Sequence, residues 1–349
     1  MSIPKTMKAA RFYEVNKPLM IEEIPVPEIA EDEVLIQIKT VGICGSDIHM
    51  VYDGNMRPVF SPITIGHEPS GVVVKTGANI NDWELGSRVS VYPIIYCGSC
   101  SNCVAGHSEI CYKLEIVGVH RDGGLAEYMV VPARNLVKLP ENISFPIGAI
   151  ITDAVATPHH SLIDRAQLKF GDSIAIFGVG GLGLHAVQIA KMAGAKQIFA
   201  IDVLDEQLDK AKQYGADITI NSTFEDPVEV IKQKTGYGVD IAAEFIGKQE
   251  TINQAANVAI IGGRIVLTGV GYDPIKIMSS VKFVRKQLSL YGSYGQTKNT
   301  IEQLVQLVSN KRLFLEDSIT HQFSLEDVNT ALEYLHKKIE NPTRIVINL

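Results

Sequence analysis

The run Asp172-Ser173-Ile174-Ala175-Ile176-Phe177, followed at once by Gly178-Val179-Gly180-Gly181-Leu182-Gly183, decides the fold. Its first half is a short apolar run typical of a buried strand, and its second half places glycines at the GxGxxG spacing. The chain continues as a helical pattern over 184–193 that Gly194 ends, and a second apolar run over 197–201 finishes at Asp202. Strand, glycine turn, helix, strand and acid together form the βαβ unit that binds a dinucleotide.

The glycine turn and the acid have separate tasks in such a unit. Backbone N–H groups at the helix N-terminus hold the pyrophosphate, and the acid binds the ribose hydroxyls. We therefore expect the cofactor to contact Gly178, Gly180, Gly181, Leu182 and Gly183 in the turn, and Asp202 and Val203 at the end of the second strand. The charge of Asp202 would repel a 2′-phosphate, and Asp205 and Glu206 follow without a nearby arginine, so NAD is favoured over NADP.

The sequence around this unit predicts two domains. Strand and helix elements are repeated after the βαβ unit, with apolar runs over 239–245, 264–267 and 288–291 among them, and together they suggest a six-stranded parallel sheet. Short apolar alternation, as in 34–38, 71–74, 88–91 and 126–131, predicts a mainly β domain over about the first 150 residues. A last apolar run over 344–349 needs a sheet to join. We therefore assign 1–154 with 295–349 to the β domain and 155–294 to the dinucleotide-binding domain. Ser324-Leu325-Glu326-Asp327 predicts a capping box opening a helix over 328–339.

Composition limits the class of protein. A chain of 349 residues is too long for one core, and 46% hydrophobic residues with 29 glycines fit an α/β globule. The net charge of −7 with interspersed signs gives no reason to expect nucleic acid or an anionic membrane as partner. The N-terminus resembles no secretory signal, and the apolar region 173–190 contains four glycines and a histidine, which argues against a membrane span. We expect a cytoplasmic protein.

Four of the five cysteines are crowded together, at Cys97, Cys100, Cys103 and Cys111. Cysteines at CxxCxxC with a fourth nearby can converge on one tetrahedral metal, and four thiolates close its coordination shell. This spacing favours a structural zinc. An iron–sulfur cluster is the first alternative, although its fourth cysteine typically follows sooner and precedes a proline, and free thiols are the second.

A second metal site is indicated by Gly66-His67-Glu68-Pro69-Ser70-Gly71 together with Cys44. A histidine, a carboxylate and a thiolate from separate segments leave a fourth zinc position open, which is typical of a metal that does chemistry. The alternative is an ordinary surface histidine beside a glutamate. Asp153 lies inside an apolar helical pattern over 148–162, where an unpaired carboxylate would be costly, so it meets a cation or metal or else caps a turn.

Two other interpretations of the sequence are excluded by their motifs. His120-Arg121-Asp122 mimics a kinase catalytic triplet but precedes the glycine turn, and no Asp-Phe-Gly follows. The chain also has no GxxxxGK[ST] motif, which removes a P-loop.

Together these motifs resemble the zinc-containing medium-chain alcohol dehydrogenase family over nearly the whole chain. The hexapeptide at 66–71 with Gly77 is similar to its zinc signature, and Val41-Gly42-Ile43-Cys44-Gly45-Ser46-Asp47-Ile48-His49 to its first-ligand segment. The resemblance implies a β-rich, GroES-like catalytic domain with two zincs, beside a Rossmann domain that binds NAD(P). It implies Cys44, His67 and Asp153 as ligands of the catalytic zinc, with Glu68 as an additional or exchanging ligand.

The resemblance also implies roles for individual residues. Ser46 and His49 would form a proton relay, Asp47 would support His67, and Arg344 would bind the pyrophosphate. Further residues near the nicotinamide would be Thr157, the loop Thr268-Gly269-Val270, and Leu290-Tyr291. Two positions depart from the family: Gln207 replaces a basic residue common near the adenosine ribose, and Ser87 replaces an aspartate in a GDRV stretch.

These expectations describe an NAD- and zinc-dependent dehydrogenase that interconverts a primary or secondary alcohol with its carbonyl compound. Polyol dehydrogenases of the sorbitol or butanediol type and threonine dehydrogenase share the same motifs and are alternatives. A non-catalytic NAD-binding redox sensor, which would not need Ser46 and His49 beside an open zinc, is the alternative from a different class. The family suggests a homodimer or homotetramer.

Overall fold

The computed structural model describes residues 3–349, which form two compact units. Unit 1 contains the described residues up to Asp153 together with Thr297–Leu349, and unit 2 contains Ala154–Gln296. Unit 1 is thus assembled from both ends of the chain.

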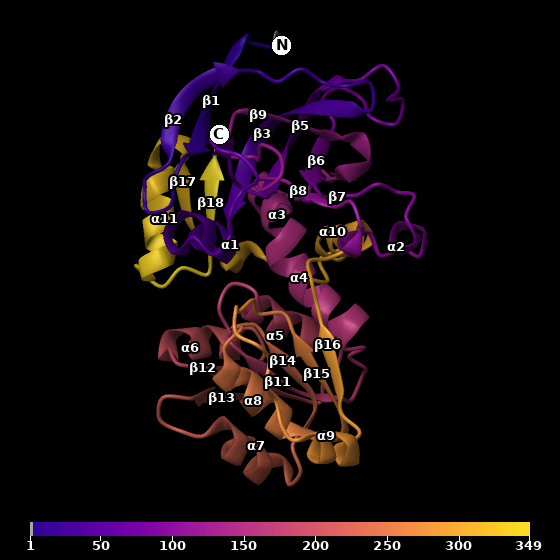
Figure 1. Ribbon diagram of the computed structural model, residues 1–349, viewed down its shortest axis with the longest axis vertical. Coiled ribbons are helices and arrows are strands. Elements are labelled where there is room, and N and C mark those ends of the chain that lie inside the picture. The colour runs from indigo at the N-terminus through magenta and orange to yellow at the C-terminus, as the bar shows by residue number, and fades with distance from the viewer. Residues whose placement is uncertain (1–2) are drawn as a thin grey trace. The chain divides into compact units, whose positions relative to one another are not determined.

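Unit 2 is built on one six-stranded sheet in which every neighbouring pair of strands is parallel (Figure 1). The strands are β11 (Ser173–Phe177), β12 (Gln197–Asp202), β13 (Ile218–Asn221), β14 (Val239–Glu244), β15 (Ala259–Leu267) and β16 (Ser289–Gly292), in the order β13-β12-β11-β14-β15-β16. The order reverses direction between β11 and β14, which is the switch point where doubly wound sheets bind their ligands. The predicted six-stranded parallel sheet is confirmed.

Helices cover this sheet because the chain must cross over between parallel strands. They are α5 (Gly183–Met192), α6 (Asp205–Gln213), α7 (Pro227–Thr235), α8 (Gln249–Val258) and α9 (Ser280–Lys286). The helix α5 starts in the glycine turn and ends before Gly194, whose φ of +82° suits a residue without a side chain. Phe177 and Phe199, on neighbouring strands, are fully buried in the core.

Unit 1 is mainly β. A three-stranded sheet contains β1 (Thr6–Phe12), β2 (Met20–Pro25) and β4 (Ile63–Thr64), and a two-stranded sheet contains β7 (Ile94–Ile95) and β8 (Glu115–Ile116). The largest sheet has seven strands: β3 (Glu33–Ile43), β5 (Glu68–Thr76), β6 (Arg88–Val91), β9 (Tyr128–Pro132), β10 (Leu136–Lys138), β17 (Ile319–Ser324) and β18 (Arg344–Asn348). Figure 1 shows β18, in yellow, beside β3, in indigo, and the two strands pair antiparallel. The C-terminal strand therefore completes the N-terminal sheet, as the sequence predicted.

The helices of unit 1 are short except near its C-terminus. They are α1 (Gly45–Ile48), the π-helical turn η1 (His49–Asp53), α2 (Ser101–Val104), α3 (Phe145–Ile150), α10 (Lys298–Ser309) and α11 (Val328–Lys337), with 3-10 turns η2 (Ser108–Ile110), η3 (Ala133–Asn135), η6 (Glu316–Ser318) and η7 (Leu325–Asp327). After α3 the chain continues in the π-helical turn η4 (Ile151–Val155); the next elements, α4 (Ala156–His159) and the π-helical turn η5 (His160–Arg165), belong to unit 2. The predicted helical pattern over 148–162 is therefore correct.

One local prediction is wrong. The structure shows no capping box at Ser324, because its hydroxyl donates to the carboxylate of Asp327 at 2.6 Å instead of accepting a backbone N–H. The 3-10 turn η7 comes first, and α11 begins only at Val328 and ends at Lys337. The competing side-chain acceptor three residues away explains the difference.

Within residues 3–349, none of the helices combines the length and the apolar character needed to cross a bilayer.

Candidate functional site

Four side chains from distant parts of unit 1 converge on one point. Cys44 directly precedes α1, His67 directly precedes β5, Glu68 is the first residue of β5, and Asp153 lies in η4. One donor atom from each residue lies within 4.8 Å of those of the others. The sequence predicted these four residues together, and the structure brings them together.

Their distances suit zinc. The Cys44 Sγ lies 3.3 Å and the His67 Nε2 lies 3.5 Å from the Asp153 Oδ2. Zinc bonds of about 2.0–2.3 Å in a tetrahedral shell place neighbouring ligand atoms about 3.3–3.8 Å apart. A sulfur, a nitrogen and an oxygen donor thus stand at the spacing that one zinc ion requires. The π-helical turn around Asp153 fits this arrangement, because such turns are frequent at functional sites.

Asp47 organises two of the four residues. Its Oδ2 accepts the backbone N–H of Cys44 at 2.8 Å, and its Oδ1 lies 3.7 Å from the His67 Nδ1. This carboxylate therefore sits behind the imidazole, on the side away from Asp153. Burial lowers the pKa of His67, but Asp153 and Asp47 outweigh it and raise the pKa well above its ordinary value. Burial and the charge of Asp153 raise the pKa of the Cys44 thiol. A cation among these groups would relieve both effects.

Glu68 has a different partner. It is fully buried, and both its oxygens accept hydrogen bonds from the Arg344 guanidinium on β18. Gly42, its register partner on β3, leaves the space that the carboxylate fills, since a Cβ there would clash with the Glu68 Oε2. The sequence predicted a pyrophosphate as the partner of Arg344, whereas the structure places this 4% exposed residue against Glu68. Its contact with a pyrophosphate stays a prediction.

The four crowded cysteines form a second cluster. The Cys100 Sγ lies 3.5 Å from the Cys103 Sγ and 3.9 Å from the Cys111 Sγ, and the Cys97 and Cys103 sulfurs are 3.9 Å apart. Zinc–sulfur bonds of about 2.3 Å predict sulfur–sulfur distances of about 3.8 Å in a tetrahedron. The spacing and the all-sulfur donor set thus fit a closed structural zinc site.

Backbone N–H groups point at these sulfurs. Cys100 and Ser99 donate to the Cys97 sulfur at 3.3 and 3.5 Å, and Lys113 donates to the Cys111 sulfur at 3.3 Å. Such donors stabilise thiolates, and they lower the pKa of Cys97 to about 5. Burial and the hydrogen bond from Cys100 raise the pKa of Cys103 to about 12. At neutral pH, Cys97 is therefore already a thiolate that can bind a cation, whereas Cys103 must still lose its proton.

The two predicted relay residues follow Cys44 closely. The Ser46 Oγ lies 3.4 Å from the His67 Nε2, which places this hydroxyl beside the ligand cluster. The His49 Nδ1 lies 2.6 Å from the Asp53 Oδ2. Sequence reasoning missed Asp53, although its position four residues after His49 was an available signal.

In unit 2, the predicted cofactor residues gather at one edge of the parallel sheet. Asp202 ends β12, and its carboxylate accepts the backbone N–H groups of Val179 at 2.9 Å and of Val203 at 2.8 Å. The acid therefore also fixes the glycine turn. At Gly183 a Cβ would clash with the carbonyl oxygen of Gly178, so only glycine fits at this position of the turn. Gly180, Gly181 and Leu182 lie between them.

The remaining predicted residues of unit 2 lie on neighbouring elements. Gly269 and Val270 follow β15, while Leu290 and Tyr291 are inside the edge strand β16. The Thr157 hydroxyl donates to the Gln296 side chain at 2.9 Å, and the Thr268 hydroxyl lies 2.7 Å from that of Ser161.

Sequence reasoning also missed Glu244, the buried last residue of β14. Its carboxylate accepts the N–H groups of Ile246 and Gly247 and the hydroxyl of Thr251. It thus shapes the loop after β14, at the same edge of the sheet as Asp202. Its signal was an acidic residue at the end of an apolar run.

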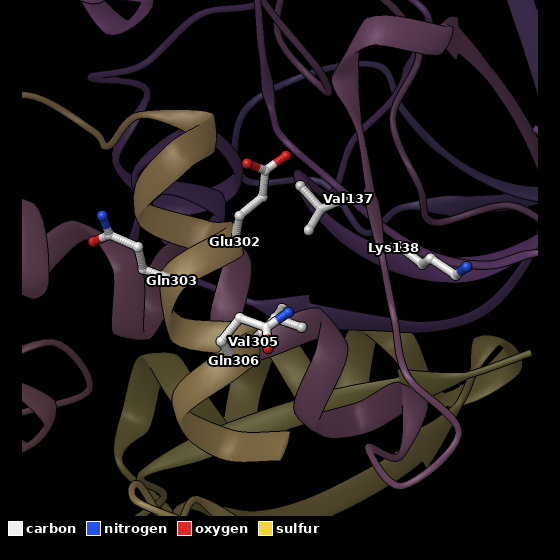
Figure 2. Close-up of a pocket in the computed structure, with 6 residues that line it drawn as sticks. All are labelled: Val137, Lys138, Glu302, Gln303, Val305 and Gln306. Atoms are coloured by element: carbon white, nitrogen blue, oxygen red, sulfur yellow. The ribbon is translucent and has the colours of Figure 1, made fainter. Parts of the chain in front are cut away.

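Unit 1 contains a further hollow of about 370 Å³, with none of the metal-ligand candidates in its wall. Figure 2 shows its lining side chains, Glu302, Gln303, Val305 and Gln306 from α10 and Val137 and Lys138 from β10. It has no cluster of convergent donor groups of the kind seen at the two metal-ligand clusters.

Comparison with known proteins gives consistent matches. The model of the alcohol dehydrogenase GroES-like domain matches 30–141, and the model of zinc-binding dehydrogenases matches 181–310. The two matches confirm the predicted fold class, a GroES-like domain combined with a Rossmann domain.

Individual proteins extend the similarity over the whole chain. The chain is 36% identical to an L-threonine 3-dehydrogenase of Bacillus velezensis over 91% of its own length and 92% of the relative. It resembles a zinc-binding dehydrogenase of Sinorhizobium meliloti 1021 bound to NADP (TM-score 0.90, 29% identity, 99% and 100% coverage). It also resembles an alcohol dehydrogenase of E. coli CFT073 complexed with NADH (TM-score 0.92, 29% identity, 99% and 100% coverage).

Proposed function

Because this chain belongs to the zinc-containing medium-chain alcohol dehydrogenases, oxidoreductases that act on CH–OH groups with a nicotinamide cofactor, we propose that it interconverts an alcohol and its carbonyl compound with NAD. The substrate is a primary or secondary alcohol. The observation that carries the proposal is the meeting of the Cys44, His67 and Asp153 donor atoms at zinc-ligand distances.

The residues of unit 1 divide the work. Cys44, His67 and Asp153 would hold the catalytic zinc, and Glu68 lies close enough to exchange with one of them. Bound zinc supplies Lewis-acid chemistry, which lowers the pKa of an alcohol hydroxyl toward neutrality. Asp47 orients His67 and the Cys44 backbone. The four-cysteine cluster holds a second, structural zinc.

Proton removal uses Ser46 and His49. The Ser46 hydroxyl lies beside the ligand cluster, and a hydroxyl can both accept and donate a hydrogen bond, so it can pass a proton outward. His49 is half exposed, so a proton on its imidazole can pass to water. A bound nicotinamide would supply the acceptor for the hydride of the alcohol carbon.

A second substrate class is favoured by one observation. The 36% identical relative is named L-threonine 3-dehydrogenase, and threonine is itself a secondary alcohol that also has an ammonium and a carboxylate group. The same ligand cluster and relay would serve its oxidation. The choice between the two classes then depends on groups that bind those charges.

The test is NADH production from a substrate panel. We expect the wild type to reduce NAD with at least one of 2-butanol, 2,3-butanediol, sorbitol and L-threonine, and a strong zinc chelator to abolish the activity. Asp153→Asn would remove one ligand charge and lower kcat by at least about a hundredfold, whereas the surface variant Asp122→Asn serves as control. No NADH from any substrate would support the non-catalytic NAD-binding alternative.

Asp202 selects NAD over NADP in this proposal. Replacing Asp202 by glycine removes the charge that repels a 2′-phosphate, so the ratio of kcat/KM for NAD to that for NADP should fall by about tenfold or more. The variant should also bind NAD more weakly, because the Val179 N–H loses its acceptor. An unchanged ratio would show that another group selects the cofactor.

The proposal also assigns a separate role to each unit. Unit 1 is the catalytic domain with both zinc sites, and unit 2 is the NAD-binding domain with Thr157, Gly269, Val270, Leu290 and Tyr291 near the nicotinamide. The active form is a homodimer or homotetramer, which light scattering of the purified protein would show.

A further inference from the structure

The side chain of His49 is bound by a carboxylate of its own helical turn. Its Nδ1 lies 2.6 Å from the Oδ2 of Asp53, with which it shares η1. The imidazole is 46% and the carboxylate 35% exposed, so the pair is open to water. An exposed pair of this kind contributes little to folding stability, which leaves its effect on the imidazole itself as its main consequence.

That effect is to choose the tautomer. A carboxylate accepts a hydrogen bond and has none to donate, so the neutral imidazole must hold its proton on Nδ1. The Nε2 is then left with a free lone pair that can take up a proton. When it does, Asp53 is already in place as the partner of the resulting positive charge.

The backbone around this pair is held on several sides. The N–H of Asn16 donates to the Val51 carbonyl at 2.7 Å, and the ring of Tyr52 stacks on that of His336 with centroids 4.2 Å apart. Gly54 ends the turn with a φ of +67° and packs against Val15. Because the backbone is fixed, the orientation of the imidazole depends on its own side-chain torsions.

Other charged groups near the turn have other partners. On α11, which supplies His336, the Glu333 carboxylate pairs with Lys337 at 2.5 Å. On α1, Asp47 accepts the Cys44 N–H and faces His67. Asp53 is therefore the carboxylate that the structure places against His49.

We propose that Asp53 is a positioning residue for proton transfer, which acts by holding His49 as the Nδ1–H tautomer with Nε2 ready to accept. The inference rests on the proposed function. In alcohol oxidation the carbon loses a hydride to NAD and the oxygen loses a proton, which Ser46 passes on. The proton forms an N–H bond at the His49 Nε2, and the imidazolium then releases one proton to water.

The test is a double-mutant cycle. Asp53→Ala should lower kcat for alcohol oxidation by about tenfold and leave the KM for NAD within about twofold, because only proton transfer is affected. In a His49→Gln background the same substitution should cause no further loss. Asp164→Ala is the matched control, since Asp164 pairs with His160 Nδ1 at 2.8 Å with the same four-residue spacing. It should leave kcat within about twofold.

A spectroscopic readout accompanies the kinetics. The ¹⁵N NMR signals of the His49 ring, assigned with His49→Gln, should show Nδ1 protonated in the neutral wild type and Nε2 protonated in Asp53→Ala. A wild-type kcat in Asp53→Ala would overturn the role of Asp53 and leave the proposed function intact. A further tenfold loss of kcat when Asp53→Ala is added to His49→Gln would do the same. An inactive wild type would overturn the proposed function and this role with it.

Discussion

The two metal-ligand clusters of unit 1 differ in how far apart their members lie in the sequence and in which groups support them. In the cysteine cluster the outermost members, Cys97 and Cys111, are 14 positions apart, and the sulfurs receive hydrogen bonds from backbone N–H groups nearby. In the mixed cluster Cys44 and Asp153 are 109 positions apart, and the supporting groups are the side chains of Asp47 and Arg344. A local cluster is specified by spacing, whereas a dispersed cluster exists only once the domain has folded.

The same difference predicts that the metal of the cysteine cluster stabilises the fold and that the metal of the mixed cluster takes part in catalysis. The cysteine cluster has four equal donors that close a coordination shell, so its metal would hold together a segment with only short helices. The mixed cluster has a hydroxyl beside it, and its member Glu68 forms a buried ion pair with Arg344, so groups beyond the ligands would tune the charge at its metal. The following predictions test this separation, from the largest expected effect to the smallest.

Removing a thiolate from the mixed cluster should have the largest effect on catalysis. Cys44→Ala should lower kcat by at least about a thousandfold, because the metal site loses a ligand, while circular dichroism and the melting temperature stay near the wild type. Steady-state NADH production and thermal unfolding measure the two quantities. A variant with near wild-type kcat would show that the mixed cluster is not the catalytic centre.

Removing a thiolate from the cysteine cluster should give the opposite pattern. Cys111→Ala should lower the melting temperature by several degrees and expose the segment around α2 to proteolysis, because the metal no longer cross-links it. The kcat of the protein that remains folded should stay within about tenfold of the wild type. A thousandfold loss of kcat without loss of stability would erase the distinction between the clusters.

The buried ion pair should matter for one cluster only. Arg344→Gln removes the positive charge that neutralises the Glu68 carboxylate. Zinc affinity at the mixed cluster should therefore rise by about tenfold. The cysteine cluster should keep its zinc at the same chelator concentration. Competition titration with a chromophoric chelator resolves the two sites, and equal shifts at both would contradict the separation.

Thiol reactivity in the metal-depleted protein should show the smallest difference. The pKa of Cys97 is lowered to about 5, so this residue is a thiolate across pH 6–8 and its alkylation rate should stay flat. The pKa of Cys44 is raised, so its rate should increase about tenfold per pH unit in that range. Mass spectrometry after timed iodoacetamide treatment measures both. A flat profile for Cys44 would contradict its burial among carboxylates.

The sequence predicted what depends on local pattern. The apolar run before Gly178 specified the first strand and turn of the parallel sheet, and the CxxCxxC spacing specified the cysteine cluster. These features need no knowledge of distant residues, because strand period and turn geometry act over a few positions.

Other features depended on resemblance or were missed. That Asp153 meets Cys44 followed from the family likeness, since an acid in an apolar helix has several possible partners. The contact between Arg344 and Glu68 joins opposite ends of the chain, and no local pattern shows it. At Ser324 the local motif was present, yet the nearby Asp327 side chain displaced the expected cap.

The most direct measurement of the central claim is the zinc content of freshly purified protein and of two variants by elemental analysis. Two separate ligand clusters predict close to two zincs per chain in the wild type, and close to one in Cys44→Ala and in Cys111→Ala. One zinc or none in the wild type, or a content that Cys44→Ala leaves unchanged, would contradict the existence of two independent zinc sites.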